Sequence, residues 1–180
     1  FWTPHSVEKH DEYILSVGTD AARDYPTLLN AIDDQSVRII SRQRIPDNLL
    51  TSNVQVSSEH SFLELRNIYR GARFVVVPLH DVDQPSGQSV ALQAMACGRA
   101  VIITRTQGLW EPQHMRHKET CYLVNPGDVH NLRETISHLY ANPEEVEEVG
   151  ANARRLIESR YNVRLLASDL QRHIIELATG

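Results

Sequence analysis

The sequence predicts an α/β fold: a Rossmann-like, doubly wound parallel sheet of about six strands, with helices on both faces and a helical C-terminal tail. The first observation is that apolar runs of strand length alternate with segments whose apolar residues recur at helical spacing. The second is that these β-then-α units have short links, as in parallel sheets. The third is that only helical patterns follow Val124.

The predicted strands are short apolar runs. Phe74–Val77 is the strongest, because a continuous, mostly β-branched run is expected of a strand that is covered on both faces. The full set is Tyr13–Val17, Val37–Ile40, Val54–Val56, Phe74–Val77, Ala100–Ile103 and Tyr122–Val124.

The predicted helices have apolar residues at three- and four-residue steps. Asn142 is expected to cap one of them, with Pro143 at its first position and Glu145 completing a capping box. The set is Tyr25–Ile32, Phe62–Gly71, Ser86–Cys97, a helix from about Val129 to Leu139, the helix opened by Asn142, and an amphipathic helix over Val163–Leu177.

The length of 180 residues fits one domain with terminal extensions. We expect a linker-like segment over 1–11, a Rossmann-like domain over 12–160 and a C-terminal helix over 161–180. The net charge of -5 argues against a general nucleic-acid binder. No run approaches the roughly 20 apolar residues of a membrane span. The two cysteines, Cys97 and Cys121, have no metal-like spacing and suggest no disulfide framework, which fits a cytoplasmic location.

The loop after Val77 is the first candidate site, because open parallel sheets bind ligands at the carboxyl ends of their strands. Ser86 is predicted as the N-cap of the next helix, and Gly87 at the first helical position lets a ligand approach the backbone closely. The free N–H groups of Gly87, Gln88 and Ser89 would then form an anion site with the positive end of the helix dipole.

A polar stripe continues from this helix start, because Ser86, Ser89 and Gln93 fall at positions i, i+3 and i+7. Such a stripe suits a nucleotide, with phosphate at the helix end and ribose beside it. A solvated helix face with an ordinary cap explains the same spacing equally well. The apolar residues of the opposite face, which can pack on the sheet, are Val90, Ala91, Ala94 and Met95.

The loop after Val17 is the second candidate. It begins with Gly18 and places Arg23 just before a helix, and an arginine can grip phosphate through two parallel hydrogen bonds. A surface salt bridge from Arg23 to Asp20 or Asp24 is an equally good explanation.

Other chemistry has little support in the sequence. There is no G-x-G-x-x-G or P-loop pattern, which leaves nicotinamide or ATP chemistry of those kinds without support. His114 and His117 lack a third ligand, so we expect no metal site and no cofactor. No catalytic residue can be assigned.

From Gln84 to Ile103, and on both flanks, the chain resembles the C-terminal, donor-binding domain of GT-B glycosyltransferases, specifically the large retaining group 1 family. The resemblance covers nearly the whole chain and rests on the order and spacing of individually modest motifs. These motifs are Phe1–Pro4, Ser16–Thr19, Arg23–Leu28, Leu65–Pro78, Ser86–Ser89, Leu92–Ile102, Val124–Asp128 and Gly150–Arg154.

The resemblance implies that the chain binds a nucleoside-diphosphate sugar and that the sugar is transferred with retention of anomeric configuration, without a metal. It gives Arg23 the position of a basic residue that neutralises the diphosphate, and Gln93 that of a glutamate that holds the ribose hydroxyls. The donor-binding set it implies is Gly18, Thr19, Arg23, Ser86, Gly87, Gln88, Ser89 and Gln93.

The sequence departs from the family pattern at two places. The paired glutamates of the family fall at Pro85 and Gln93. An amide can still hydrogen-bond a diol, whereas Pro85 cannot contact a sugar hydroxyl as a glutamate would, so Gln84 or Ser86 would have to substitute. The arginine that often follows the first-strand glycine is Thr19 here, which leaves Arg23 more of the phosphate charge.

A GT-B enzyme needs two such domains, so the resemblance also implies a missing N-terminal, acceptor-binding domain as partner. The isolated chain is then expected to bind donor weakly and to transfer nothing, and any peripheral membrane contact would come through the missing domain. Two alternatives stay open. One is a GT-B type nucleotide-sugar epimerase. The other is a degenerate, non-catalytic nucleotide-sugar-binding or scaffold module, which the missing glutamates favour.

Overall fold

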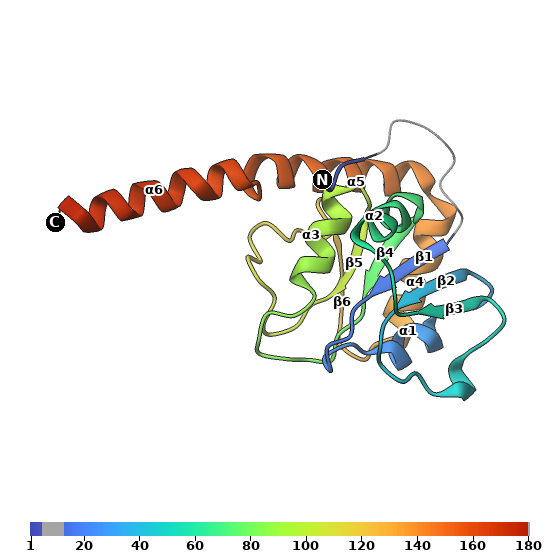
Figure 1. The fold of residues 1–180 in the computed structure, drawn as a ribbon. Helices are drawn as coiled ribbons and strands as arrows, with labels where there is room; N and C mark the ends of the chain where they lie inside the picture. The colour runs from blue at the N-terminus through green and yellow to red at the C-terminus, as the bar shows by residue number, and fades with distance from the viewer. Residues whose placement is uncertain (5–12, 180) are drawn as a thin grey trace.

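The computed structural model in Figure 1 describes residues 1–4 and 13–179. Its strands form one 6-stranded parallel sheet in the order β3-β2-β1-β4-β5-β6, which confirms the predicted Rossmann-like, doubly wound fold. The strands are β1 (Tyr13–Val17), β2 (Ser36–Ile40), β3 (Val54–Ser57), β4 (Phe74–Val77), β5 (Val101–Thr104) and β6 (Tyr122–Val124).

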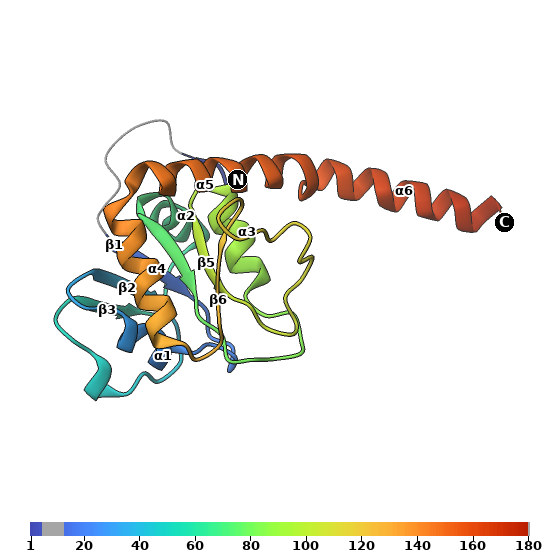
Figure 2. The ribbon, with the colours of Figure 1, turned by 180° about the vertical axis from the view of Figure 1, so that it is seen from behind.

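Helices cover both faces of the sheet, as predicted. α2 (Phe62–Gly71) and α3 (Gln88–Ala96) lie over the face turned to the viewer in Figure 1. α1 (Tyr25–Ala31) and α4 (Val129–Ala141) cover the opposite face, seen in Figure 2. A short 3-10 turn, η1 (Asp47–Leu49), precedes β3.

Two long helices close the chain. α5 (Pro143–Arg160) packs on the end of α3 and contributes side chains to the cores on both faces of the sheet. α6 (Val163–Thr179) follows after a two-residue break and projects beyond the sheet, so its last turns lie far from the strands (Figures 1 and 2). In the described residues no helix is both long and apolar enough to cross a membrane.

Side chains of the central strands alternate between two hydrophobic cores. In β4, Val75 and Val77 join the core beneath α2 and α3, whereas Phe74 and Val76 join the core beneath α1 and α4. All four are buried, as expected of a parallel strand covered on both faces. The sheet is therefore a rigid platform whose loops carry the polar groups.

The first residues of the expected linker-like segment lie on α2. The ring of Trp2 meets that of Tyr69 edge-on with 5.6 Å between centroids, and Arg70 Nε donates to the Thr3 carbonyl at 2.7 Å. Residues 5–11 of this predicted segment fall outside the described part of the chain.

The capping box predicted at the start of α5 is wrong. Asn142 is the N-cap and Pro143 opens the helix, but the Asn142 side chain makes no capping hydrogen bond and instead donates to the His138 carbonyl at 2.7 Å. The Glu145 carboxylate is engaged by the hydroxyl of Tyr122 and, at 2.6 Å, by His138 Nε2. Glu145 therefore contacts side chains from β6 and α4 in place of the backbone at the start of its own helix.

The contact between α5 and the end of α3 depends on Gly150. A Cβ atom there would lie 2.4 Å from the Gly98 carbonyl oxygen. We predict that Gly150→Ala destabilises the fold by about 1–3 kcal/mol through overpacking, although alanine has the higher helix propensity. Urea unfolding measures this change.

The exposed neighbour Ala151 supplies the reference for that experiment. Ala151→Gly should lower stability by about 1 kcal/mol through helix propensity alone. A gain in stability from Gly150→Ala similar in size to that loss would show that the helices can separate freely.

Candidate functional site

The strand order places the candidate site at the carboxyl ends of β1 and β4. Strand order reverses between these neighbours, and such a switch point is where open α/β sheets leave a crevice. The two loops that follow them are joined by backbone hydrogen bonds: Asp24 N donates to the Pro78 carbonyl at 3.1 Å, and His80 N to the Ala22 carbonyl at 2.9 Å. The two candidate loops therefore form one site, at the lower edge of the sheet in Figure 1.

Arg23 lies at the centre of this junction. Its side chain is only 3% exposed, and Nε donates to the Val17 carbonyl at 3.1 Å. Nη1 donates to Ser86 Oγ at 3.3 Å and lies 3.4 Å from Asp20 Oδ2. The ion pair with Asp20 that the sequence offered as an alternative therefore exists, but its arginine is buried rather than on the surface.

Gly18 makes room for this arginine. It has φ +142°, and a Cβ atom on it would lie 2.1 Å from Arg23 Nε. The hydroxyl of Tyr25 donates to the Gly18 carbonyl at 2.5 Å. Burial raises the pKa of Tyr25, which keeps this donor protonated at neutral pH. The start of the loop is thus fixed by two contacts of Gly18, one with the Arg23 side chain and one with the Tyr25 hydroxyl.

The N-cap of α3 lies one residue later than predicted. Gly87, not Ser86, is the N-cap, in a left-handed conformation with φ 73° and with no side-chain capping bond. A Cβ atom on Gly87 would lie 2.5 Å from Val77 Cγ1, so close packing on β4 requires glycine. Gln88 and Ser89 form the exposed first turn, whose N–H groups lack intrahelical acceptors.

The displaced residue Ser86 has a tertiary role instead. Its hydroxyl accepts from Arg23 and donates to Asp20 Oδ2 at 2.9 Å. Sequence spacing could not distinguish this role from that of a local cap. The helix start lies where the sequence predicted it, and Ser86 links it to the other loop.

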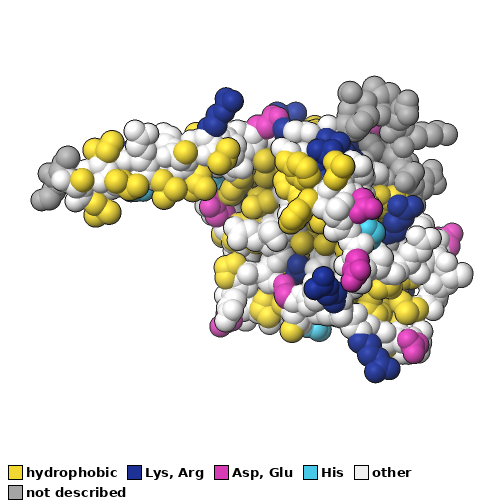
Figure 3. Space-filling model, viewed as in Figure 1, with side chains coloured by type: hydrophobic (Ala, Val, Ile, Leu, Met, Phe, Trp, Pro, Cys, Tyr) yellow, Lys and Arg dark blue, Asp and Glu magenta, His cyan; other side chains and the backbone are white. Residues whose placement is uncertain are grey.

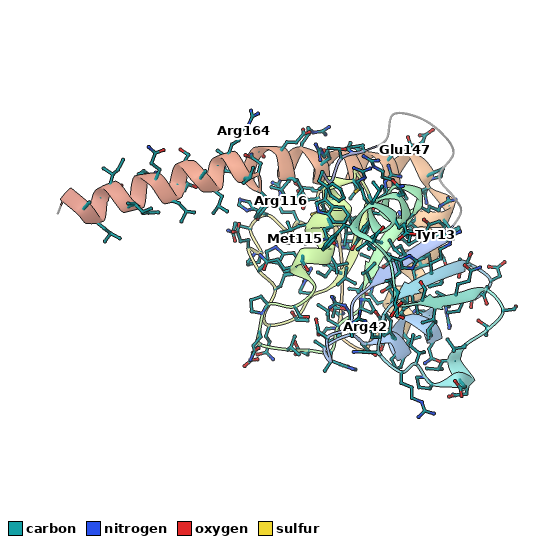
Figure 4. All side chains as sticks on the ribbon, in the orientation of Figure 1. Tyr13, Arg42, Met115, Arg116, Glu147 and Arg164 are labelled. Atoms are coloured by element: carbon teal, nitrogen blue, oxygen red, sulfur yellow. The ribbon has the colours of Figure 1, made fainter. Side chains whose placement is uncertain are left out.

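A hollow of about 430 Å³ opens beside these groups, within the size range of small-molecule sites. Ser86 is the member of the predicted donor-binding set that lines this hollow. The other seven lie outside its lining: Gly18, Thr19, Arg23, Gly87, Gln88, Ser89 and Gln93. Gln93 lies half-buried on α3. Thr19 is turned toward the neighbouring loop, where its Oγ1 accepts from the backbone N–H of Arg42, a residue labelled in Figure 4. The hollow is lined by Asp20, Ala22, Val82, Asp83, Gln84, Pro85 and Ser86.

The loop after β5 packs against the segment 81–84, which contributes to the lining of this hollow. Gly108 N donates to the Val82 carbonyl at 2.8 Å, and a Cβ atom on Gly108 would meet the Gln84 carbonyl oxygen at 2.4 Å. Gln107 Nε2 donates to Asp81 Oδ2 at 3.1 Å. The sequence analysis did not predict these contacts. The one feature of the sequence that could have indicated them is Gly108, because a glycine in a loop often marks a close approach of two backbones.

Glu111 and the two histidines stabilise the loop between β5 and β6. Hydrogen bonds to Glu111 Oε2 from the Tyr161 hydroxyl and the His114 ring, both at 2.7 Å, lower the pKa of this carboxyl. His117 Nδ1 instead accepts from Leu123 N at 3.0 Å. The histidines thus serve separate contacts, and the described residues hold no cluster of three or more potential metal ligands.

The packing of Arg23 across Gly18 can be tested by a double-mutant cycle. We predict that Gly18→Ala costs about 1–2 kcal/mol less stability in an Arg23→Ala background than in the wild-type chain, because the clash with the guanidinium is then absent while the backbone strain of the positive φ remains. Denaturant unfolding of the four chains measures this coupling. Gly127→Ala, at a glycine with open space around it, should cost the same in both backgrounds. An equal cost of Gly18→Ala in both backgrounds would contradict the arrangement.

The sequence model of the family "Glycosyl transferases group 1" matches residues 21–142, which is more than half of the chain. A search among curated proteins finds no match.

Solved structures share the fold. Sucrose-phosphate synthase from Thermosynechococcus elongatus is 24% identical with a TM-score of 0.77, over 93% of this chain and 45% of that one. Anabaena HepE in complex with UDP-glucose is 12% identical with a TM-score of 0.76, over 92% and 49%. The C-terminal domain of a group 1 family glycosyl transferase, LpcC from Francisella tularensis, is 18% identical with a TM-score of 0.73, over 90% and 96%.

The chain thus spans about half the length of the first two structures and nearly all of the third, which is a C-terminal domain by itself. This agrees with the resemblance to a GT-B C-terminal domain drawn from the sequence.

Proposed function

We propose that this chain, which belongs to the group 1 glycosyltransferase family, is the nucleoside-diphosphate-sugar-binding half of a retaining glycosyltransferase. The observation that carries the proposal is the buried guanidinium of Arg23, held at the switch point beside the start of α3. The solved complex of HepE with UDP-glucose, which shares this fold, supports the ligand class.

Three kinds of anion-binding group meet at this place. Arg23 supplies a cation, Ser86 a hydroxyl, and the first turn of α3 its free N–H groups and the positive end of a helix dipole. A diphosphate carries enough charge to engage all three. In this proposal the protein itself neutralises the diphosphate, in place of a metal ion or other cofactor.

The remaining donor contacts are proposed from the family pattern. Gln93, half-buried on the helix that begins at the anion site, would hydrogen-bond the ribose hydroxyls. Pro85 lines the hollow without a sugar-binding group, whereas its neighbours Gln84 and Ser86 line the same hollow with polar side chains. These neighbours are the proposed contacts to the sugar.

α6 supports the proposal that an acceptor-binding domain completes the enzyme. One stripe of this helix is apolar, and each of its five large side chains is more than half exposed. Figure 3 shows hydrophobic side chains along the lower side of α6, and Figure 4 shows Arg164 on the upper side, away from Met115 and Arg116. The stripe consists of Val163, Leu166, Leu170, Ile174 and Leu177.

An exposed apolar stripe of this kind is typical of an interaction surface. The solved chains of sucrose-phosphate synthase and HepE are about twice as long as this one. We therefore propose that a second domain packs on the apolar stripe of α6. The acceptor is unknown. Cys97 and Cys121, both free and buried, support a reducing, cytoplasmic location.

A non-catalytic binding or scaffold module is the second candidate. It is favoured by Pro85 and Gln93, which replace the two glutamates of the family pattern. Nucleotide binding discriminates between these functions, because a scaffold needs none.

We predict saturable binding of at least one of UDP, GDP and ADP in calorimetric titrations. Arg23→Ala should weaken it about tenfold to hundredfold, since a hydrogen bond from a charged group to phosphate contributes about 1.5–3 kcal/mol. Gln93→Ala, which removes a neutral partner, should weaken it about threefold to tenfold.

Arg172→Ala provides the matched control, because Arg172 is an exposed arginine on α6 paired with Asp169. It should leave the affinity unchanged. If no nucleotide binds the wild-type chain, the donor-site proposal fails and the scaffold function is preferred.

The isolated chain is expected to transfer no sugar, because the acceptor and half of the cleft would belong to the other domain. Release of nucleoside diphosphate from UDP-, GDP- and ADP-sugars, with and without simple sugar acceptors, measures this. Sustained turnover by the 180-residue chain would contradict the need for a second domain.

A further inference from the structure

We infer that the Asp20 carboxylate occupies the anion position of this site and competes with the diphosphate of the donor. The inference rests on the proposed function and concerns the same site. It is drawn from the contacts of the Asp20 carboxylate, a residue outside the donor-binding set that the family resemblance implies.

The Asp20 carboxylate takes the hydrogen bonds that a phosphate group would take. Oδ1 accepts from Ala22 N at 2.7 Å. Oδ2 accepts from Ser86 Oγ at 2.9 Å and lies 3.4 Å from Arg23 Nη1. A backbone N–H, a hydroxyl and a guanidinium together are the usual partners of a phosphate in proteins.

The two members of the ion pair differ in freedom to move. The Asp20 side chain is 51% exposed and borders the hollow, whereas that of Arg23 is 3% exposed. Arg23 is also held by the Val17 carbonyl and lies across Gly18. An arriving anion can therefore displace Asp20 into solvent, while the guanidinium stays in place.

The opposite role for Asp20 would be to position Arg23 for the ligand. The hydrogen bond from Arg23 Nε to the Val17 carbonyl does not involve Asp20, whereas the Ser86 hydroxyl contacts both Arg23 and Asp20. A competing carboxylate and a positioning carboxylate predict opposite effects on affinity when the charge is removed, so one experiment separates them.

The test is titration of the wild-type chain and of Asp20→Asn with UDP, GDP, ADP and inorganic pyrophosphate. Asparagine keeps the shape of the side chain and can still accept from Ala22 N. We expect roughly fivefold tighter binding of the nucleotide and of pyrophosphate, as removal of one like charge a few ångströms away implies. Asp20→Glu, which keeps the charge, should show no such gain.

Asp47→Asn is the matched control, because Asp47 is an exposed carboxylate at the start of η1, outside the hollow. It should change affinity by less than about twofold, since solvent and salt screen a surface charge outside the site. An equal gain from Asp47→Asn would indicate a general effect of net charge and overturn the inference. Asp20→Ser serves as a second variant, and thermal melting checks that each variant folds.

The outcomes separate this inference from the proposed function. If the wild-type chain binds a nucleotide and the folded Asp20→Asn and Asp20→Ser variants bind it equally or more weakly, the inference is overturned and the donor site stands. If the wild-type chain and both variants bind neither nucleotide nor pyrophosphate, both fail. Binding that is measurable only after the charge of Asp20 is removed supports the inference, whereas the proposed donor function of the wild-type chain then fails.

Discussion

The guanidinium of Arg23 lies almost wholly out of water, and the carboxyl ends of β1 and β4 are built around it. A buried cation is tolerated only when its N–H groups find partners. Here a carbonyl at the end of β1, a hydroxyl just before α3 and a carboxylate in its own loop provide them. Gly18 is required because any side chain there would occupy the space of the arginine.

The geometry of α3 follows from the same junction. Gly87 turns the chain through a left-handed conformation so that the helix can begin directly against Val77. This directs the first turn of α3 toward the loop that carries Arg23. The cation and the helix start thus reach one place from segments about sixty residues apart, and both rest on strands that are buried on both faces.

The site loops are supported by contacts that do not touch the hollow. Glu111 binds Tyr161, which caps the end of α5, so the loop after β5 is tied to the point where α6 departs. Figure 4 shows Met115 and Arg116 on this loop, beneath α6. The point where α6 departs and the hollow at the sheet edge are therefore linked through one segment of chain.

Most secondary structure was predictable because it depends on local spacing. All six strands and the major helices appear where periodicity placed them, within one or two residues at their ends. The predictions failed at helix starts. Ser86 and Glu145 have the residue types of local caps, yet each is engaged by side chains from distant elements. Local pattern cannot reveal a partner that is distant in sequence.

The sequence by itself determined the parallel α/β architecture, the two loops that carry the site and the glycines that these loops require, because periodicity and conformational freedom are properties of short segments. It left two explanations of Arg23 equally open, as a phosphate ligand or as the partner of a surface carboxylate. Only the tertiary structure decided that this arginine is buried, is shared between two loops and faces Asp20. The physical reason is that burial and pairing of a charge depend on which strands become neighbours, and the order of strands in the sheet is set by the packing of the whole chain.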